Sequence, residues 1–307
     1  MPVQIAAAPV SYGVFEITAD RDDLPSGEAL ASAMAAAGYV GTELGPPGFF
    51  GADGHDVGTL LKAHGLALVG SFLPLRFSRE EGFREDLASL DETLRLLDDA
   101  SEKAGRPMVL LCDAFCEPER MQHAGAIEQH PETWLDAKRQ ALLVANTQRA
   151  AERCRELGFE VSFHYHAGTY VETPREIAAF VEAIDHSLLG LCFDTGHTAF
   201  GGGDPLATLR EYAELINHVH LKDVDLALLA RLHGEHRGLE DAWAEGVFCE
   251  LGTGGGRCDD CLSELRTSGY DGWIVVEQDR VLGPAMTFPG ALESAKRNRA
   301  FLRDRGW

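Results

Sequence analysis

Two polar side chains, Asp194 and His197, lie at the carboxyl end of an apolar run in the stretch 189–197. An apolar run of this length is typical of a strand buried in a parallel sheet. The carboxyl end of such a strand is where barrel enzymes place their chemistry. A carboxylate and an imidazole are also common ligands of divalent metals. The stretch therefore predicts a functional strand end.

Three other strand-like segments end in the same way. Segment 160–166 ends with His164 and His166, segment 216–223 with His220, Lys222 and Asp223, and segment 273–277 with Glu277. Taken alone, each histidine is better explained as a core or strand-end residue with its hydrogen bonds satisfied. Four strand ends with oxygen and imidazole ligands instead suggest one divalent metal held by a ring of strands.

The elements that would position these residues alternate along the chain. The predicted strands lie in 3–13, 39–44, 66–75, 107–113, 160–166, 189–197, 216–223 and 273–277. The predicted helices are 30–37, a helix capped by Asp56 that runs through His64, 83–104, 131–157, one that starts at Thr173, one capped by Asp204, and 291–303. This alternation is the pattern of a parallel α/β barrel, the TIM (β/α)8 fold.

The 307 residues match the size of one such barrel domain, with an insertion at 224–257. The insertion is expected to hold a helix and the glycine-rich run 251–256. This run has the wrong spacing for a phosphate loop, so we interpret it as a flexible connector. The polar segment 114–132 is long enough to be an active-site loop.

Composition narrows the classes of partner. The net charge of −22 argues against nucleic acid or an anionic membrane surface as a partner. No run of 18 apolar residues exists, so no membrane span is predicted. Seven cysteines, an odd number, and no secretory segment predict a reduced cytoplasmic protein. The pair Cys258 and Cys261 is explained by coincidence or by a labile disulfide on a helix.

Several motifs carry a resemblance to a known family. Asp194-Thr-Gly-His197, His218-Val-His-Leu-Lys-Asp223 and Val275-Val-Glu-Gln-Asp279 resemble the xylose-isomerase-like barrel superfamily of sugar isomerases, epimerases and metal-dependent abasic-site endonucleases. Within it, the stretches 8–15, 41–46, 164–169 and 277–279 are most similar to the inosose dehydratases, which dehydrate 2-keto-myo-inositol. The similarity runs nearly end to end.

The resemblance implies a metal site. Its ligands would be His164, Asp194, His220 and Glu277. The superfamily usually has a glutamate at the first of these positions, and the histidine here leaves open whether the site has three or four protein ligands. Two imidazoles suit Mn²⁺ or Co²⁺ better than Mg²⁺.

The implied reaction is a β-elimination that dehydrates a keto-cyclitol or keto-sugar through a metal-stabilised enediolate. The candidate bases and acids are His166, His197, Lys222 and Glu43. Glu43 could instead cap a loop or pair with an arginine, and Lys222 could neutralise Asp223 or the metal carboxylates. His197 could orient substrate hydroxyl groups.

Other functions remain open on the same site. They are epimerisation or isomerisation of a ketose, and β-elimination from a 3-keto-glycoside. Epimerisation is less favoured because the symmetric pair of metal-bound glutamates is lost. An abasic-site endonuclease would need more metal ligands and a surface that attracts phosphates, which the charge opposes. The sequence is also compatible with a barrel that has lost catalysis and serves as a binding or scaffold protein. It is compatible with a homo-oligomer as well.

Overall fold

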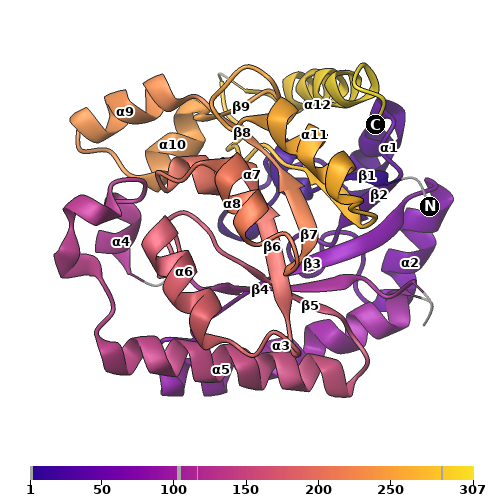
Figure 1. Ribbon diagram of the computed structural model, residues 1–307. Helices are drawn as coiled ribbons and strands as arrows, with labels where there is room; N and C mark the ends of the chain where they lie inside the picture. The colour runs from indigo at the N-terminus through magenta and orange to yellow at the C-terminus, as the bar shows by residue number, and fades with distance from the viewer. Residues whose placement is uncertain (1–2, 102–104, 116, 285) are drawn as a thin grey trace.

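Eight parallel strands close into a barrel, which confirms the predicted fold class (Figure 1). The computed structural model describes residues 3–101, 105–115, 117–284 and 286–307. The strands are β1 (Gln4–Ala7), β2 (Gly41–Glu43), β3 (Ala67–Leu75), β4 (Met108–Asp113), β5 (Val161–His164), β6 (Gly190–Asp194), β7 (Ile216–Leu221) and β10 (Trp273–Val276). They follow one another around the barrel in the order β1-β10-β7-β6-β5-β4-β3-β2.

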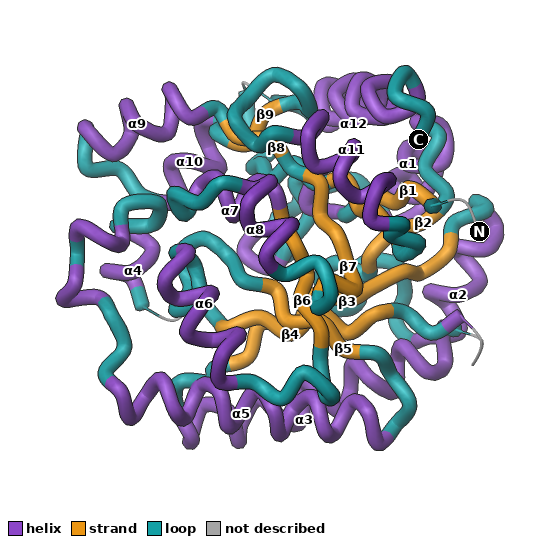
Figure 2. Tube along the Cα trace, in the orientation of Figure 1, coloured by secondary structure: helices purple, strands orange, loops and turns teal. Residues whose placement is uncertain are grey.

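Helices surround the barrel on its outside (Figure 2). The longer helices are α1 (Gly27–Ala37), α2 (Gly54–Ala63), α3 (Glu80–Ala100), α5 (Ala137–Glu156), α6 (Pro174–Ala183), α11 (Cys258–Ser268) and α12 (Phe288–Arg303). Shorter helices are α4 (Pro118–Gln122), α7 (Thr195–Phe200) and α8 (Pro205–Glu211). The predicted helix 83–104 includes residues 102–104, which lie outside the described residues.

Side-chain caps decide where the helices begin. Thr173 and Glu176 form a capping box on α6, and Asp204 caps α8, as predicted. The helices predicted from residues 30, 83 and 291 each begin three residues earlier. Two further predicted starts are wrong because another residue is the cap. Asp53 caps α2 by accepting the backbone N–H of Asp56, so Asp56 lies inside the helix. Asp136 caps α5, and the turn Pro131–Thr133 before it is a separate 3-10 helix.

The strands alternate between two environments. On β7, Val219 and Leu221 belong to the main hydrophobic core between strands and helices. His218 and His220 alternate with them and therefore point into the barrel. Other interior positions are small or apolar, namely Ala6 on β1, Ala8 just after β1 and Val275 on β10. Polar side chains thus occupy part of the barrel interior, and small ones leave space beside them.

The segment 224–257 is more regular than predicted. It contains two helices, α9 (Leu226–Gly234) and α10 (Leu239–Glu245), and the strand β9 (Phe248–Cys249). β9 pairs antiparallel with β8 (Asp223–Val224). A hydrophobic cluster that includes Trp243 and Phe248 holds the helices against the end of the barrel.

The interpretation of 251–256 as a flexible connector is wrong. The buried carboxylate of Asp223 accepts backbone N–H groups of Gly252 at 2.8 Å, Gly254 at 3.0 Å and Gly256 at 2.7 Å. A Cβ atom on Gly254 would lie 2.3 Å from the carbonyl oxygen of Val224. Glycine is therefore needed here for close approach of backbone to a carboxylate.

The six cysteines among the described residues are free thiols. Cys258 and Cys261 lie on the buried face of α11, so the disulfide considered for this pair is not formed. Cys116 lies outside the described residues. In the part of the chain that the structure describes, no helix is both long enough and apolar enough to cross a membrane.

Candidate metal and substrate site

Four strand ends deliver the predicted metal ligands to one place. His164 is the last residue of β5, Asp194 is the last of β6, His220 lies near the end of β7, and Glu277 follows β10. All four are buried. Asp194 also caps α7, because its Oδ1 accepts the backbone N–H of His197 at 2.8 Å. This bond fixes the carboxylate and leaves Oδ2 to face the other three residues.

The spacing of the four side chains fits one ion. Nδ1 of His220 lies 2.9 Å from Nε2 of His164 and 3.1 Å from Oε2 of Glu277. Oδ2 of Asp194 lies 3.6 Å from Nε2 of His164 and 3.7 Å from Nδ1 of His220. Ligands bonded at about 2.0–2.2 Å to one divalent ion lie roughly 3–4 Å apart. The four residues form a group that could hold a metal ion.

The electrostatics of this group also fit a cation. Oδ2 of Asp194 is buried and accepts no hydrogen bond from the described residues. Burial opposes ionisation, but the charge of Lys222 keeps the pKa of Asp194 well below its usual value. Burial lowers the pKa of His164, so its ring is neutral and can offer a lone pair. A buried carboxylate oxygen that accepts no hydrogen bond is a site that attracts positive charge.

Lys222 supplies positive charge from behind the proposed ligands. Its Nζ lies 2.9 Å from Oε2 of Glu277, 3.3 Å from Oδ2 of Asp194 and 2.8 Å from Oδ1 of Asp279. These carboxylates raise the pKa of Lys222 well above its usual value although burial opposes the charge. Asp223, one of the partners considered for Lys222, binds backbone N–H groups instead.

A second cluster lies beside the first. It consists of His166 in the loop after β5, His197 in α7 and Asp279 after β10. Oδ2 of Asp279 lies 3.5 Å from Nε2 of His197 and 4.0 Å from Nε2 of His166. The centroids of the two imidazole rings lie 3.6 Å apart. Burial holds the pKa of both histidines well below the usual value, so both rings are neutral.

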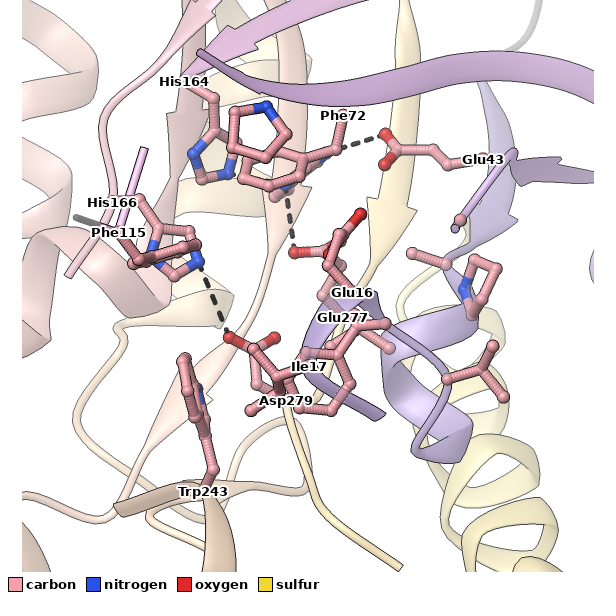
Figure 3. A pocket seen from close by; sticks show the side chains of 18 residues that line it. Glu16, Ile17, Glu43, Phe72, Phe115, His164, His166, Trp243, Glu277 and Asp279 are labelled. Carbon is pink, nitrogen blue, oxygen red and sulfur yellow. Dashed lines mark hydrogen bonds and ion pairs between the residues drawn. The ribbon is translucent and has the colours of Figure 1, made fainter. Parts of the chain in front are cut away.

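The hydrogen bonds of His166 define which nitrogen is available. Its Nδ1 lies 2.8 Å from the carbonyl oxygen of Ala167, which can only accept. Nδ1 therefore carries the hydrogen, and Nε2 has the free lone pair. Figure 3 shows this nitrogen directed toward Asp279 inside the pocket.

Glu43 reaches two histidines instead of an arginine or a loop. Its Oε1 lies 2.9 Å from Nε2 of His218 and 2.8 Å from Nε2 of His220. Burial would raise the pKa of Glu43, but His220 and His218 lower it to about 2. The carboxylate is therefore ionised at neutral pH.

The pocket lies above these groups and has about 710 Å³ of space including its mouth. Its polar lining comprises Glu16, Glu43, His164, His166, His220, Glu277 and Asp279. Its aromatic lining comprises Phe15, Phe72, Phe115 and Trp243 (Figure 3). Asp194, His197 and Lys222 lie behind the lining. This size suits a small molecule.

The eight residues predicted from the sequence are thus brought together around one pocket. Sequence reasoning missed the place of Asp279, although it stands two residues after Glu277 in a motif already singled out. It also missed Trp243, which comes from the insertion. Nothing in the sequence around Trp243 indicates that this residue lines a pocket at the carboxyl ends of the barrel strands.

Known proteins are similar to this chain over most of its length. An inosose dehydratase of Geobacillus kaustophilus is 32% identical over 94% of this chain and 90% of its own length. The rhizopine catabolism protein MocC of Rhizobium meliloti is 32% identical over 91% of this chain and 82% of its own.

Solved structures show the same fold at low sequence identity. The probable 3-DHS dehydratase AsbF of Bacillus anthracis superposes with a TM-score of 0.69 at 16% identity, over 99% of this chain and 100% of that one. A 3-keto-D-glucoside 4-epimerase of E. coli superposes with a TM-score of 0.63 at 15% identity, over 98% and 99%. The family profile of the xylose isomerase-like TIM barrel matches residues 31–305. The chain therefore belongs to the xylose isomerase-like TIM barrel family.

Proposed function

We propose that this chain is a divalent-metal-dependent lyase that dehydrates a keto-cyclitol or keto-sugar of the inosose type by β-elimination. The similarity to inosose dehydratases over most of both chains supports the substrate class. One observation in the site carries the chemistry. A neutral His166 offers Nε2 to the pocket, beside the four residues that could hold a metal.

The proposed metal ligands are His164, Asp194, His220 and Glu277. A bound divalent ion would supply positive charge beside the ketone oxygen, where negative charge develops when the neighbouring proton leaves. Two nitrogen and two oxygen ligands suit Mn²⁺ or Co²⁺ better than Mg²⁺.

His166 is the proposed base. Its Nε2 has a free lone pair, and its low pKa keeps it unprotonated and ready to accept the proton next to the ketone. His197 packs against its ring and lies 3.5 Å from Asp279, so it holds both groups in place.

The proposed proton source for the departing hydroxyl is the pair of Lys222 and Asp279. Lys222 lies behind the pocket, but its Nζ is 2.8 Å from Asp279, which lines the pocket. Burial raises the pKa of Asp279 to about 6, so this carboxyl group can carry a proton near neutral pH. One proton leaves the substrate to His166, one arrives from this pair, and the hydroxyl departs as water.

The test is an incubation of the purified protein with 2-keto-myo-inositol and Mn²⁺ in D₂O. We expect an absorbance of the diketone and a product that has lost one water molecule, and His166→Gln should abolish both. Uptake of deuterium with no loss of water would contradict the proposal and favour an epimerase or isomerase. Cleavage of a 3-keto-glycoside, with no turnover of the cyclitol, would favour elimination from that substrate.

The proposal extends to the setting of the enzyme. The whole chain would form one barrel domain in which 224–257 is an insertion that builds part of the pocket. Six free thiols, five of them buried, fit the reducing cytoplasm.

A further inference from the structure

We infer that Glu43 and His218 position the metal ligand His220 and so set the metal affinity of the site. In this arrangement Glu43 is a positioning residue, and the proton transfers belong to other groups. The inference rests on the part of the proposed function that places a divalent ion at the four strand ends.

The hydrogen bonds around Glu43 determine which nitrogen of His220 faces the proposed ion. Oε1 of Glu43 lies 2.8 Å from Nε2 of His220. A carboxylate only accepts, so Nε2 carries a hydrogen, and Nδ1 is the nitrogen left to bind the proposed ion. Nδ1 is the atom that faces His164 and Glu277, at 2.9 and 3.1 Å. A carboxylate behind a histidine ligand orients the ring and makes it a better donor to the metal.

Glu43 reaches His220 from a distant strand. Between β2 and β7 the barrel places β1 and β10, so the side chain of Glu43 must cross the interior. Small residues leave the crossing open, namely Ala6 on β1 and Ala8 just after it. Gly70 also leaves room, since a Cβ atom on it would lie 3.2 Å from Oε1 of Glu43. The small interior residues therefore leave the space through which Glu43 reaches His220.

His218 holds Glu43 in this position. It lies two residues before His220 on β7, and its Nε2 is 2.9 Å from the same Oε1. The two imidazole rings meet nearly edge to face, with centroids 5.3 Å apart. His218 is buried and does not line the pocket. An effect of His218 on the metal must therefore act through Glu43 and His220.

The experiment measures the Kd of the purified protein for Mn²⁺ by electron paramagnetic resonance of the free ion. We expect Glu43→Gln to weaken binding by about 10- to 100-fold, the range found when such supporting groups are removed. His218→Leu removes the hydrogen bond and should weaken binding by about 10-fold. His218→Gln keeps an N–H near the position of Nε2 and should restore most of the affinity.

Controls separate this effect from misfolding. His186→Leu changes an exposed histidine whose Nε2 contacts the carbonyl oxygen of Val181. It should leave the Kd unchanged. Each variant should show the circular dichroism spectrum of the wild type.

Two outcomes would overturn the inference. The first is a Kd for Mn²⁺ that is unchanged in both Glu43→Gln and His218→Leu. The second is an unchanged Kd with a large loss of turnover in Glu43→Gln, which would make Glu43 a group that touches substrate. Wild-type protein that binds Mn²⁺ but does not dehydrate the cyclitol would refute the proposed function and leave this inference standing.

Discussion

His164 decides how many protein ligands a bound ion would have. Because its Nε2 lies beside His220 and Asp194, we expect His164→Ala to lower metal content and activity together, each by about 10-fold or more. His164→Glu should keep the metal, weaken dehydration and gain exchange of the α-proton, because a carboxylate can act as a base there. Metal analysis and the deuterium assay measure these effects. Full metal content in His164→Ala with reduced turnover would instead place His164 behind the ligands.

Asp113 at the end of β4 predicts a pH dependence of stability. Its Oδ2 accepts the backbone N–H of Tyr170 at 3.2 Å, and Oδ1 is buried with no hydrogen bond to the described residues. Burial raises its pKa from 3.8 to about 7. The folded protein therefore holds this proton more tightly than the unfolded chain does. The resulting stability is full below about pH 4 and is lost as the pH rises through about 7.

The variant Asp113→Asn has no such proton to lose. Relative to this variant, the wild type should lose about 2–4 kcal/mol of unfolding free energy between about pH 4 and about pH 8. Urea denaturation of both proteins at the two pH values measures the difference. If the unfolding free energy changes equally with pH in both proteins, Asp113 does not have a raised pKa and the prediction is wrong.

At the scale of elements, the first turn of α7 makes room for Lys222. A Cβ atom on Gly196 would lie 2.6 Å from Cγ of Lys222. We therefore expect Gly196→Ala to displace the lysine from Asp279 and to reduce turnover by about 10- to 100-fold, since proton transfer by a positioned group is worth at least that much. Gly234→Ala in α9 meets no atom within 4 Å and is the matched control. Equal turnover in both variants would show that Lys222 does not need its present position.

The insertion supplies an aromatic wall through α10. Trp243 lies edge to face with Phe15 at 5.6 Å and with Phe115 at 6.1 Å between ring centroids. Trp243→Phe removes apolar surface from the pocket, so we expect KM to rise about 3- to 10-fold while kcat changes little. Trp134→Phe, at an exposed position, is the control. Steady-state kinetics that show lower kcat at unchanged KM would place Trp243 in the chemical step.

Across the whole molecule, the sequence was most informative about features that every parallel barrel shares. Parallel strands in a closed barrel end at one face, so polar residues after four apolar runs had to meet there. That rule predicted that four strand ends meet, and the resemblance to the family then selected His164, Asp194, His220 and Glu277 among their polar residues. Helix starts were less certain because Asp53 and Asp56 are both good caps, and only the local backbone decides between them.

Contacts between distant parts of the chain could not be predicted in this way. The reach of Glu43 across the barrel depends on small residues in two other strands. The binding of the glycine-rich run by Asp223 depends on how the insertion folds back. No periodic pattern or fixed spacing in the sequence indicates either contact, because each joins residues that only the folded structure brings together.

The net charge of −22 is a property of the whole molecule that bears on the alternatives. It opposes binding of a polyanion such as DNA. The charge therefore favours a small polyol substrate over an abasic site.

The central claim, that four strand ends hold one catalytic divalent ion, is tested most directly by the metal content of Asp194→Asn. Wild type and variant are loaded with Mn²⁺, dialysed together and analysed for metal per chain and for dehydration of 2-keto-myo-inositol. The account predicts one ion per chain in the wild type, and loss of both metal and activity in the variant. A variant that keeps full metal content and full activity would contradict it.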